Sequence, residues 1–107
     1  MQRIFIETKE FSKRWKILGM TEDDLKELQE YLLLKPDAGV VMKGTGGLRK
    51  IRWAKNKGKS GGVRTLYIDF STEERIYLVT VFGKKEKDNL TNEEKNNIRS
   101  FIKNLLK

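Results

Sequence analysis

Amphipathic helical patterns stand near both ends of this 107-residue chain and enclose a middle region with the pattern of strands and turns. Near the start, Leu25, Leu28 and Leu32 recur at helical spacing, and Pro36 ends the pattern. Near the end, apolar residues repeat with the same spacing at positions 98, 101, 102, 105 and 106. Between residues 40 and 82, apolar side chains instead come in short runs divided by glycines. This order predicts an α+β domain.

The predicted elements follow one another in the order β–α–α–β–β–β–β–α. The strands are expected at residues 3–7, 40–42, 48–54, 63–70 and 76–82. The helices begin at Thr8, Thr21 and Thr91, and the last two have an acidic partner three residues on, as in a capping box. Consecutive strands with short connections predict an antiparallel meander. Helices grouped at the two ends of the chain predict that all of them cover one face of the sheet and leave the other open.

Composition excludes several kinds of site. The chain has no cysteine and no histidine, so disulfides, thiol nucleophiles, Cys- and His-based metal sites and histidine acid–base catalysis are excluded. We expect no cofactor and no bound metal. No apolar run approaches the roughly 20 residues of a membrane span, and no secretory signal is visible. The expectation is a single domain over residues 1–107, in a soluble cytoplasmic protein without membrane contact.

The positive charge is concentrated in the middle of the chain. Residues 38–68 contain no acidic residue and eight basic ones, namely Lys43, Arg49, Lys50, Arg52, Lys55, Lys57, Lys59 and Arg64. The rest of the chain carries 15 basic and 15 acidic residues, so the whole net charge of +8 arises in this segment. A lysine-rich stretch is often an ordinary solvated surface, but a concentrated positive field attracts polyanions. Because the rest of the chain is balanced, we favour nucleic-acid contact.

Glycine-rich segments in the same region could suggest phosphate-binding loops. Gly58, Lys59 and Ser60 match the end of a P-loop, but the position five residues earlier is Trp53, where that motif needs glycine. No βαβ unit follows the glycines of residues 44–47, so a dinucleotide-binding fingerprint also fails. These segments are predicted to be turns that connect strands.

Several residues have both a structural and a functional interpretation. Arg64 begins a strand, where it can form a structural ion pair or belong to a site. Lys84 and Lys85 follow the last strand and can be a surface pair or part of a site, because side chains at strand ends often converge. Trp53 and Tyr67 can stack on bases, although packing in the core is the simpler interpretation.

A cluster of cations is chemically sufficient to cleave RNA without metal or cofactor. The RNA supplies its own nucleophile, the 2′-hydroxyl group. The protein must stabilise the charge that develops on the phosphate, which arginine and lysine can do. It must also assist proton transfer, for which a lysine whose pKa is lowered by neighbouring cations can serve. Such a reaction remains slow unless something else holds the substrate in line.

Four segments of the chain read GTGGLRKIR at 44–52, GKSGGVR at 58–64, FGKKE at 82–86 and NLT at 89–91. Together they resemble the RelE/ParE superfamily of toxins, and the branch they resemble most is the HigB-like toxins of type II toxin–antitoxin systems. The resemblance implies a RelE-like, microbial-RNase-like α+β fold with an antiparallel-dominated sheet, an N-terminal helix hairpin and a C-terminal helix. It implies a ribosome-dependent mRNA endonuclease that blocks translation. The implied partners are the ribosome, mRNA and a neutralising antitoxin protein, with the toxin itself a monomer.

The resemblance also implies the roles of individual residues. Arg64 matches the arginine that contacts the scissile phosphate, and the catalytic set is expected to be Arg64, Arg52, Lys84 and Lys85. The RNA-binding set is expected to be Arg49, Lys50, Lys55, Lys57 and Lys59. Many relatives place a tyrosine or histidine near the end of the domain as acid or base, whereas this chain has Asn89, Leu90 and Thr91 there. A lysine is therefore our expected proton donor.

Two other functions fit the same sequence. The same fold hosts gyrase-poisoning toxins of the ParE type, which act through protein–protein contact, so fold alone does not decide. The cations of residues 38–68 argue against this function, because poisoning does not require them. A non-catalytic basic module that binds RNA or the ribosome also remains open, because the acid–base tyrosine is missing.

Overall fold

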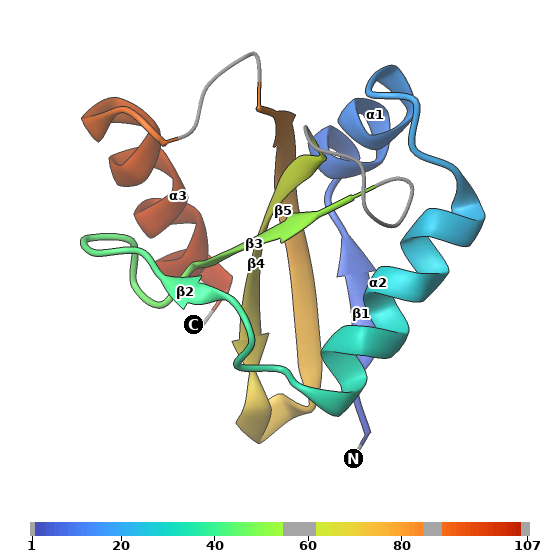
Figure 1. Cartoon of the computed structure of the whole chain (residues 1–107). Helices are drawn as coiled ribbons and strands as arrows, with labels where there is room; N and C mark the ends of the chain where they lie inside the picture. The colour runs from blue at the N-terminus through green and yellow to red at the C-terminus, as the bar shows by residue number, and fades with distance from the viewer. Residues whose placement is uncertain (1, 55–61, 85–88, 106–107) are drawn as a thin grey trace.

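The computed structural model describes residues 2–54, 62–84 and 89–105. In this part of the chain, three α-helices and a short 3-10 helix accompany one five-stranded sheet (Figure 1). The elements are β1 (Ile4–Glu7), α1 (Lys9–Ile17), α2 (Glu22–Leu34), β2 (Val40–Val41), β3 (Arg49–Trp53), β4 (Val63–Phe70), η1 (Ser71–Glu73), β5 (Arg75–Gly83) and α3 (Asn92–Leu105). The α+β class is confirmed, and the predicted element order is correct.

The strands follow the order β1-β5-β4-β3-β2 across the sheet. The predicted meander is confirmed, since β2, β3, β4 and β5 pair in antiparallel fashion with their chain neighbours. β1 adds to the far edge of β5 in the parallel direction, with Ile4 opposite Arg75. The sheet is therefore mixed, although antiparallel pairs dominate it.

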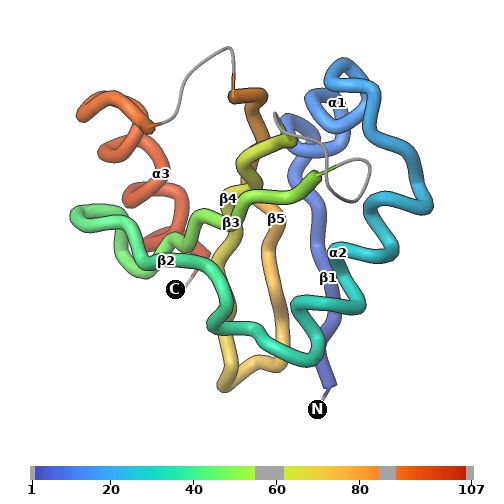
Figure 2. The backbone as a smooth tube through the Cα atoms, in the orientation of Figure 1, coloured from blue at the N-terminus to red at the C-terminus, as the bar shows by residue number. Residues whose placement is uncertain are grey.

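The helices lie on both faces of the sheet, so the prediction of a single covered face is wrong. Figures 1 and 2 show α1 and α2 on one side of the sheet and α3 on the other. The reason lies in the alternation of β4, which buries Val63 and Tyr67 on one face and Leu66 and Ile68 on the other. A strand that is apolar on both faces needs cover on both.

The helix starts confirm the caps read from the sequence. The hydroxyl of Thr8 accepts a hydrogen bond from the backbone of Phe11 at 3.0 Å. Thr21 and Asp24 form a complete capping box, with both reciprocal hydrogen bonds present. Thr91 pairs with Glu94 in the same way at the start of α3. Each box satisfies two backbone donors that a helix start otherwise leaves unpaired.

The α1/α2 face carries the larger apolar cluster, which contains Phe11, Trp15, Leu28 and Leu32. Tyr67 is fully buried in this cluster. Its hydroxyl donates to the carbonyl of Pro36 and accepts from the backbone of Gly39, both at 2.8 Å. Burial raises the pKa of Tyr67, because the charged phenolate is poorly solvated there.

Trp53 packs against Tyr31 of α2, with ring centroids 5.4 Å apart, at the margin of the same cluster. Tyr67 lies within it. For both aromatic residues, therefore, the core interpretation agrees with the structure.

The α3 face carries a second apolar cluster, which includes Leu48, Leu66, Ile68 and Ile102. The turn between β2 and β3 lies beside α3 (Figure 2), and a Cβ atom added at Gly46 would come within 3.7 Å of Ile102. This second cluster occupies only part of its face, and the part beyond it holds the site described below.

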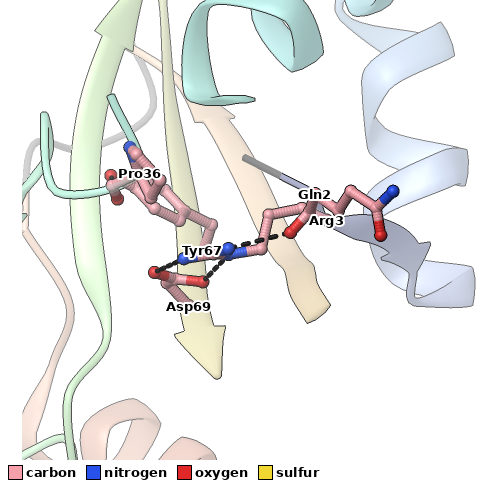
Figure 3. A network of polar contacts seen from close by, with 5 residues as sticks. All are labelled: Gln2, Arg3, Pro36, Tyr67 and Asp69. Carbon is pink, nitrogen blue, oxygen red and sulfur yellow. Dashed lines mark hydrogen bonds and ion pairs between the residues drawn. The ribbon is translucent and has the colours of Figure 1, made fainter. Parts of the chain in front are cut away.

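A polar network lies at the end of the sheet where β1 begins and β4 ends (Figure 3). Arg3 donates from Nε to Asp69 Oδ1 at 2.7 Å and from Nη2 to Oδ2 at 3.2 Å, which ties the start of β1 to the end of β4. The hydrogen bond with Asp69 raises the pKa of Arg3. Figure 3 also shows Tyr67 and Pro36, which are joined by a buried hydrogen bond. An ion pair and buried hydrogen bonds therefore both stabilise this end of the sheet.

Candidate functional site

The pairing of β3 with β4 brings two arginines together. Arg52 lies directly opposite Arg64, and Lys50 lies opposite Leu66. Side chains directly opposite each other in an antiparallel pair share one face and have Cβ atoms roughly 4.5–5.5 Å apart. Because Leu66 belongs to the apolar cluster under α3, all three cations lie on the α3 face. We call Lys50, Arg52 and Arg64 the basic cluster.

Arg64 is the buried member of the basic cluster, with an exposed fraction of 4%. Its Nη1 atom donates to the carbonyl of Gly62 at 3.4 Å, and Phe82 of β5 lies opposite it on the other side. Arg64 lies at the end of an apolar row that Leu66, Ile68 and Phe70 form on the α3 face. A guanidinium held in this way has few conformations to lose on binding a ligand.

The other two members are more accessible. Arg52 is exposed, and Lys50 is half-buried and donates from Nζ to Asn89 Oδ1 at 3.1 Å. This hydrogen bond joins β3 to the segment immediately before α3. Like charges placed directly opposite each other destabilise a sheet, so the facing arginines of β3 and β4 have an energetic cost. A bound anion would remove that cost.

Arg49 lies on the opposite face of β3, since its cross-strand partner is Tyr67. Its Nη1 atom donates to the carbonyl of Gly39 at 2.8 Å and to that of Asp37 at 3.2 Å. These bonds hold the segment between α2 and β2. The structure thus gives Arg49 a structural contact away from the basic cluster, and its role in RNA binding stays a prediction.

Lys84 follows β5 directly and is exposed. Gly83 lies opposite Val63, so Lys84 stands at the same end of the sheet as Arg64. Its predicted partner Lys85 lies outside the described residues, as do Lys55, Lys57 and Lys59. The functional roles of all four stay predictions.

Sequence reasoning missed the contribution of Asn89. The resemblance drew attention to residues 89–91 only because an expected tyrosine or histidine is absent there. In the structure, the Asn89 side chain accepts the hydrogen bond of Lys50. No spacing rule would have connected residues 39 positions apart, because their contact depends on how α3 returns to the sheet.

The arrangement is suited to binding a phosphate. Two guanidinium groups and one ammonium group can neutralise a phosphodiester, and arginine can contact it with two parallel hydrogen bonds. Within residues 2–54, 62–84 and 89–105, no group of three or more acidic side chains could hold a metal ion. Over the same ranges, no helix has the length and apolar character needed to cross a membrane.

A family model and two solved structures are similar to this chain. A family model described as the RelE toxin of the RelE/RelB toxin–antitoxin system matches residues 2–107. The structure resembles a mutant of the E. coli toxin RelE in the free state, with a TM-score of 0.54 and 17% sequence identity. That match covers 76% of this chain and 82% of the other.

A second similar structure is the intact E. coli RelBE toxin–antitoxin complex. The TM-score is 0.56 at 18% identity, and the match covers 74% of this chain and 93% of that chain. These two likenesses confirm the predicted fold. The assignment to the HigB-like branch stays a prediction.

Proposed function

This chain belongs to the RelE toxin family of toxin–antitoxin systems, and we propose that it is a ribosome-dependent endoribonuclease that cuts mRNA and so blocks translation. The observation that carries this proposal is the facing pair Arg52 and Arg64, with Lys50 beside them at one end of the sheet. The basic cluster gives this end of the sheet a positive field, as an RNA-cleaving site needs.

In the proposed reaction, the 2′-oxygen of the RNA forms a bond to the adjacent phosphorus while the bond from phosphorus to the 5′-oxygen breaks. The products are a 2′,3′-cyclic phosphate and a new 5′-hydroxyl end. Arg64 and Arg52 stabilise the negative charge that grows on the non-bridging oxygens. Lys84 stands at the same end of the sheet and adds positive charge.

Two protons must move during this reaction: one leaves the 2′-hydroxyl group and one reaches the departing 5′-oxygen. Lys50 is our candidate for one of these transfers, because Asn89 holds its ammonium group in place. We propose that the ribosome aligns the substrate, so that cleavage occurs only when the ribosome is present.

We further propose that this toxin acts in the cytoplasm and is neutralised there by a protein antitoxin, since one of its structural neighbours is a toxin–antitoxin complex. An antitoxin with an acidic segment would complement the basic cluster of the described sheet. Such a segment would cover the site by charge, whereas a bulky antitoxin would block entry to the ribosome instead.

The decisive experiment is primer extension on an mRNA in a reconstituted translation reaction, with and without ribosomes. We expect new 5′ ends only when ribosomes and the wild-type protein are both present, and none with Arg64→Ala. Circular dichroism must show that the variant is folded. A folded, fully active Arg64→Ala variant would contradict the assignment of this residue.

Two other outcomes would replace the proposal. Translation arrest without new RNA ends would indicate a binding module. DNA breaks with intact mRNA would indicate a gyrase poison.

A further inference from the structure

A pocket of about 330 Å³ lies next to the basic cluster, at the outer edge of β5. Thr80, Val81 and Phe82 of β5 line it. Phe82 lies directly opposite Arg64 in the sheet, so the pocket begins one strand away from the buried guanidinium. Neighbouring strands are roughly 4.8 Å apart. A ligand that touches the basic cluster can therefore also reach the pocket.

Two helices form the polar rim of this pocket. α1 contributes Glu10 and Arg14, and α3 contributes Glu94 and Asn97. Arg14 donates from Nε to the carbonyl of Val81 at 3.0 Å, which fixes its guanidinium against the strand. Glu94 accepts from the backbone of Thr91 at 2.9 Å and is likewise held in place. The rim is thus built from oriented groups of both signs.

The lining distinguishes this pocket from a second phosphate site. Two carboxylates would repel a phosphate, while the apolar surface of Val81, Phe82 and Ile98 suits a flat, uncharged ring. Its volume is near the lower end of the range for small-molecule sites, roughly 300–1,000 Å³. In single-stranded RNA, the part that is flat, uncharged and polar at its edge is the base.

We propose that this pocket binds the base of a nucleotide next to the phosphate held by the basic cluster, and that it prefers bases with an exocyclic amino group over uracil. Carboxylates accept hydrogen bonds from amino groups, and the amide of Asn97 can both donate and accept. Uracil would turn carbonyl oxygens toward Glu10 and Glu94. The inference rests on the proposed function only in taking RNA as the ligand.

The test measures binding without cleavage. The probes are three trinucleotides that lack the 2′-hydroxyl group at the scissile position and carry guanine, uracil or no base at the pocket nucleotide. Methyl signals of Ile98 and Leu90, which line the pocket, are followed by NMR in the wild-type protein. We expect these signals to move with the guanine probe, which should bind about tenfold more tightly than the abasic one, given the usual value of stacking a base.

Matched variants on one helix sharpen the test. Glu94→Gln should remove most of the preference for guanine over uracil, because it replaces one of the two carboxylates while its amide oxygen can still cap α3. Asn104→Ala, an exposed asparagine farther along α3, should leave that preference unchanged. Equal affinity of wild-type protein for the guanine and abasic probes would overturn the proposal. So would pocket signals that move with an antitoxin but with none of the RNA probes.

Failure of this inference and failure of the proposed function give different results. Base-dependent binding without ribosome-dependent cleavage would keep the pocket and remove the endonuclease. Cleavage in the translation reaction without any base dependence of binding would keep the endonuclease and remove the pocket.

Discussion

The two faces of β4 differ. On the face that α1 and α2 cover, Val63 and Tyr67 both pack in the apolar cluster. On the α3 face, the side chains are apolar at Leu66 and Ile68 but cationic at Arg64. Both sets of residues alternate along one strand, so a single backbone serves two purposes. On the α1/α2 face, the side chains along this length stabilise the fold by packing. The other gives up part of its apolar contact in order to present charge.

The position of the change is informative. Arg64 stands one residue from the start of β4, where the described strands β3 and β5 also end. At this strand end the Arg64 side chain rests on apolar neighbours, and its guanidinium, although buried, lies on the strand directly opposite the exposed Arg52. In the middle of β4 the same charge would be enclosed by the cluster under α3 and would cost far more. The following predictions test this division between the two faces.

The largest effect is expected on the face that carries stability. Leu32→Ala should lower the free energy of unfolding by about 2–5 kcal/mol, because Leu32 is a fully buried residue of α2 and its truncation leaves a cavity. Urea denaturation measures this change. Leu34→Ala is the matched control, since that side chain is 81% exposed on the same helix and should change stability little. Equal losses in the two variants would contradict the division.

The next effect is expected on activity. Arg64→Lys keeps the charge but loses the planar, two-pronged contact with phosphate. We expect ribosome-dependent cleavage to fall by about 10²-fold, as when one transition-state donor is removed. Stability should change less than in Leu32→Ala. Arg75→Lys, an exposed arginine at the opposite end of the sheet, should cleave like the wild type.

Tyr67→Phe removes two buried hydrogen bonds and should cost about 1–3 kcal/mol of stability, with cleavage by the folded fraction unchanged. The pH dependence of this stability difference is a more specific test than its size. Because the pKa of Tyr67 is raised in the folded state, its contribution is complete below about pH 10, the pKa of free tyrosine. It is lost as the pH rises through the folded value. The stability difference between wild type and variant should shrink in that range, and a difference that stayed constant would contradict the burial argument.

The smallest effect concerns Asn89, which accepts a hydrogen bond from Lys50 of the basic cluster. Asn89→Ala should reduce cleavage several-fold, in line with about 1 kcal/mol for one hydrogen bond. In a double-mutant cycle, adding Asn89→Ala to Lys50→Ala should cause little further loss. Additive losses would show that Asn89 acts independently of Lys50.

Much of the fold could be predicted because its signals are local. The capping boxes at Thr21 and Thr91 depend on residues that are close together in the sequence, and so does the apolar alternation of β4. The parallel pairing of β1 with β5 could not be predicted in the same way. A strand pattern defines a strand but not its neighbour in the sheet.

The site was predictable as a set of residue types but not as an arrangement. The sequence grouped Arg49 with Lys50, yet adjacent strand residues point to opposite faces, so the two diverge in the structure. The strand register decides which cations meet, and it places Arg52 opposite Arg64. The contact between Lys50 and Asn89 depends on the return of α3 and has no signature in spacing.

The parallel pairing of β1 with β5 has a consequence for how this protein is made. Its first strand must wait for a partner roughly 70 residues later in the chain, since Ile4 pairs with Arg75. Contacts between such distant residues slow folding, because a long loop must close before the pairing rewards it. During synthesis, the sheet cannot be completed until the β5 partners of β1, residues 75–78, have been translated.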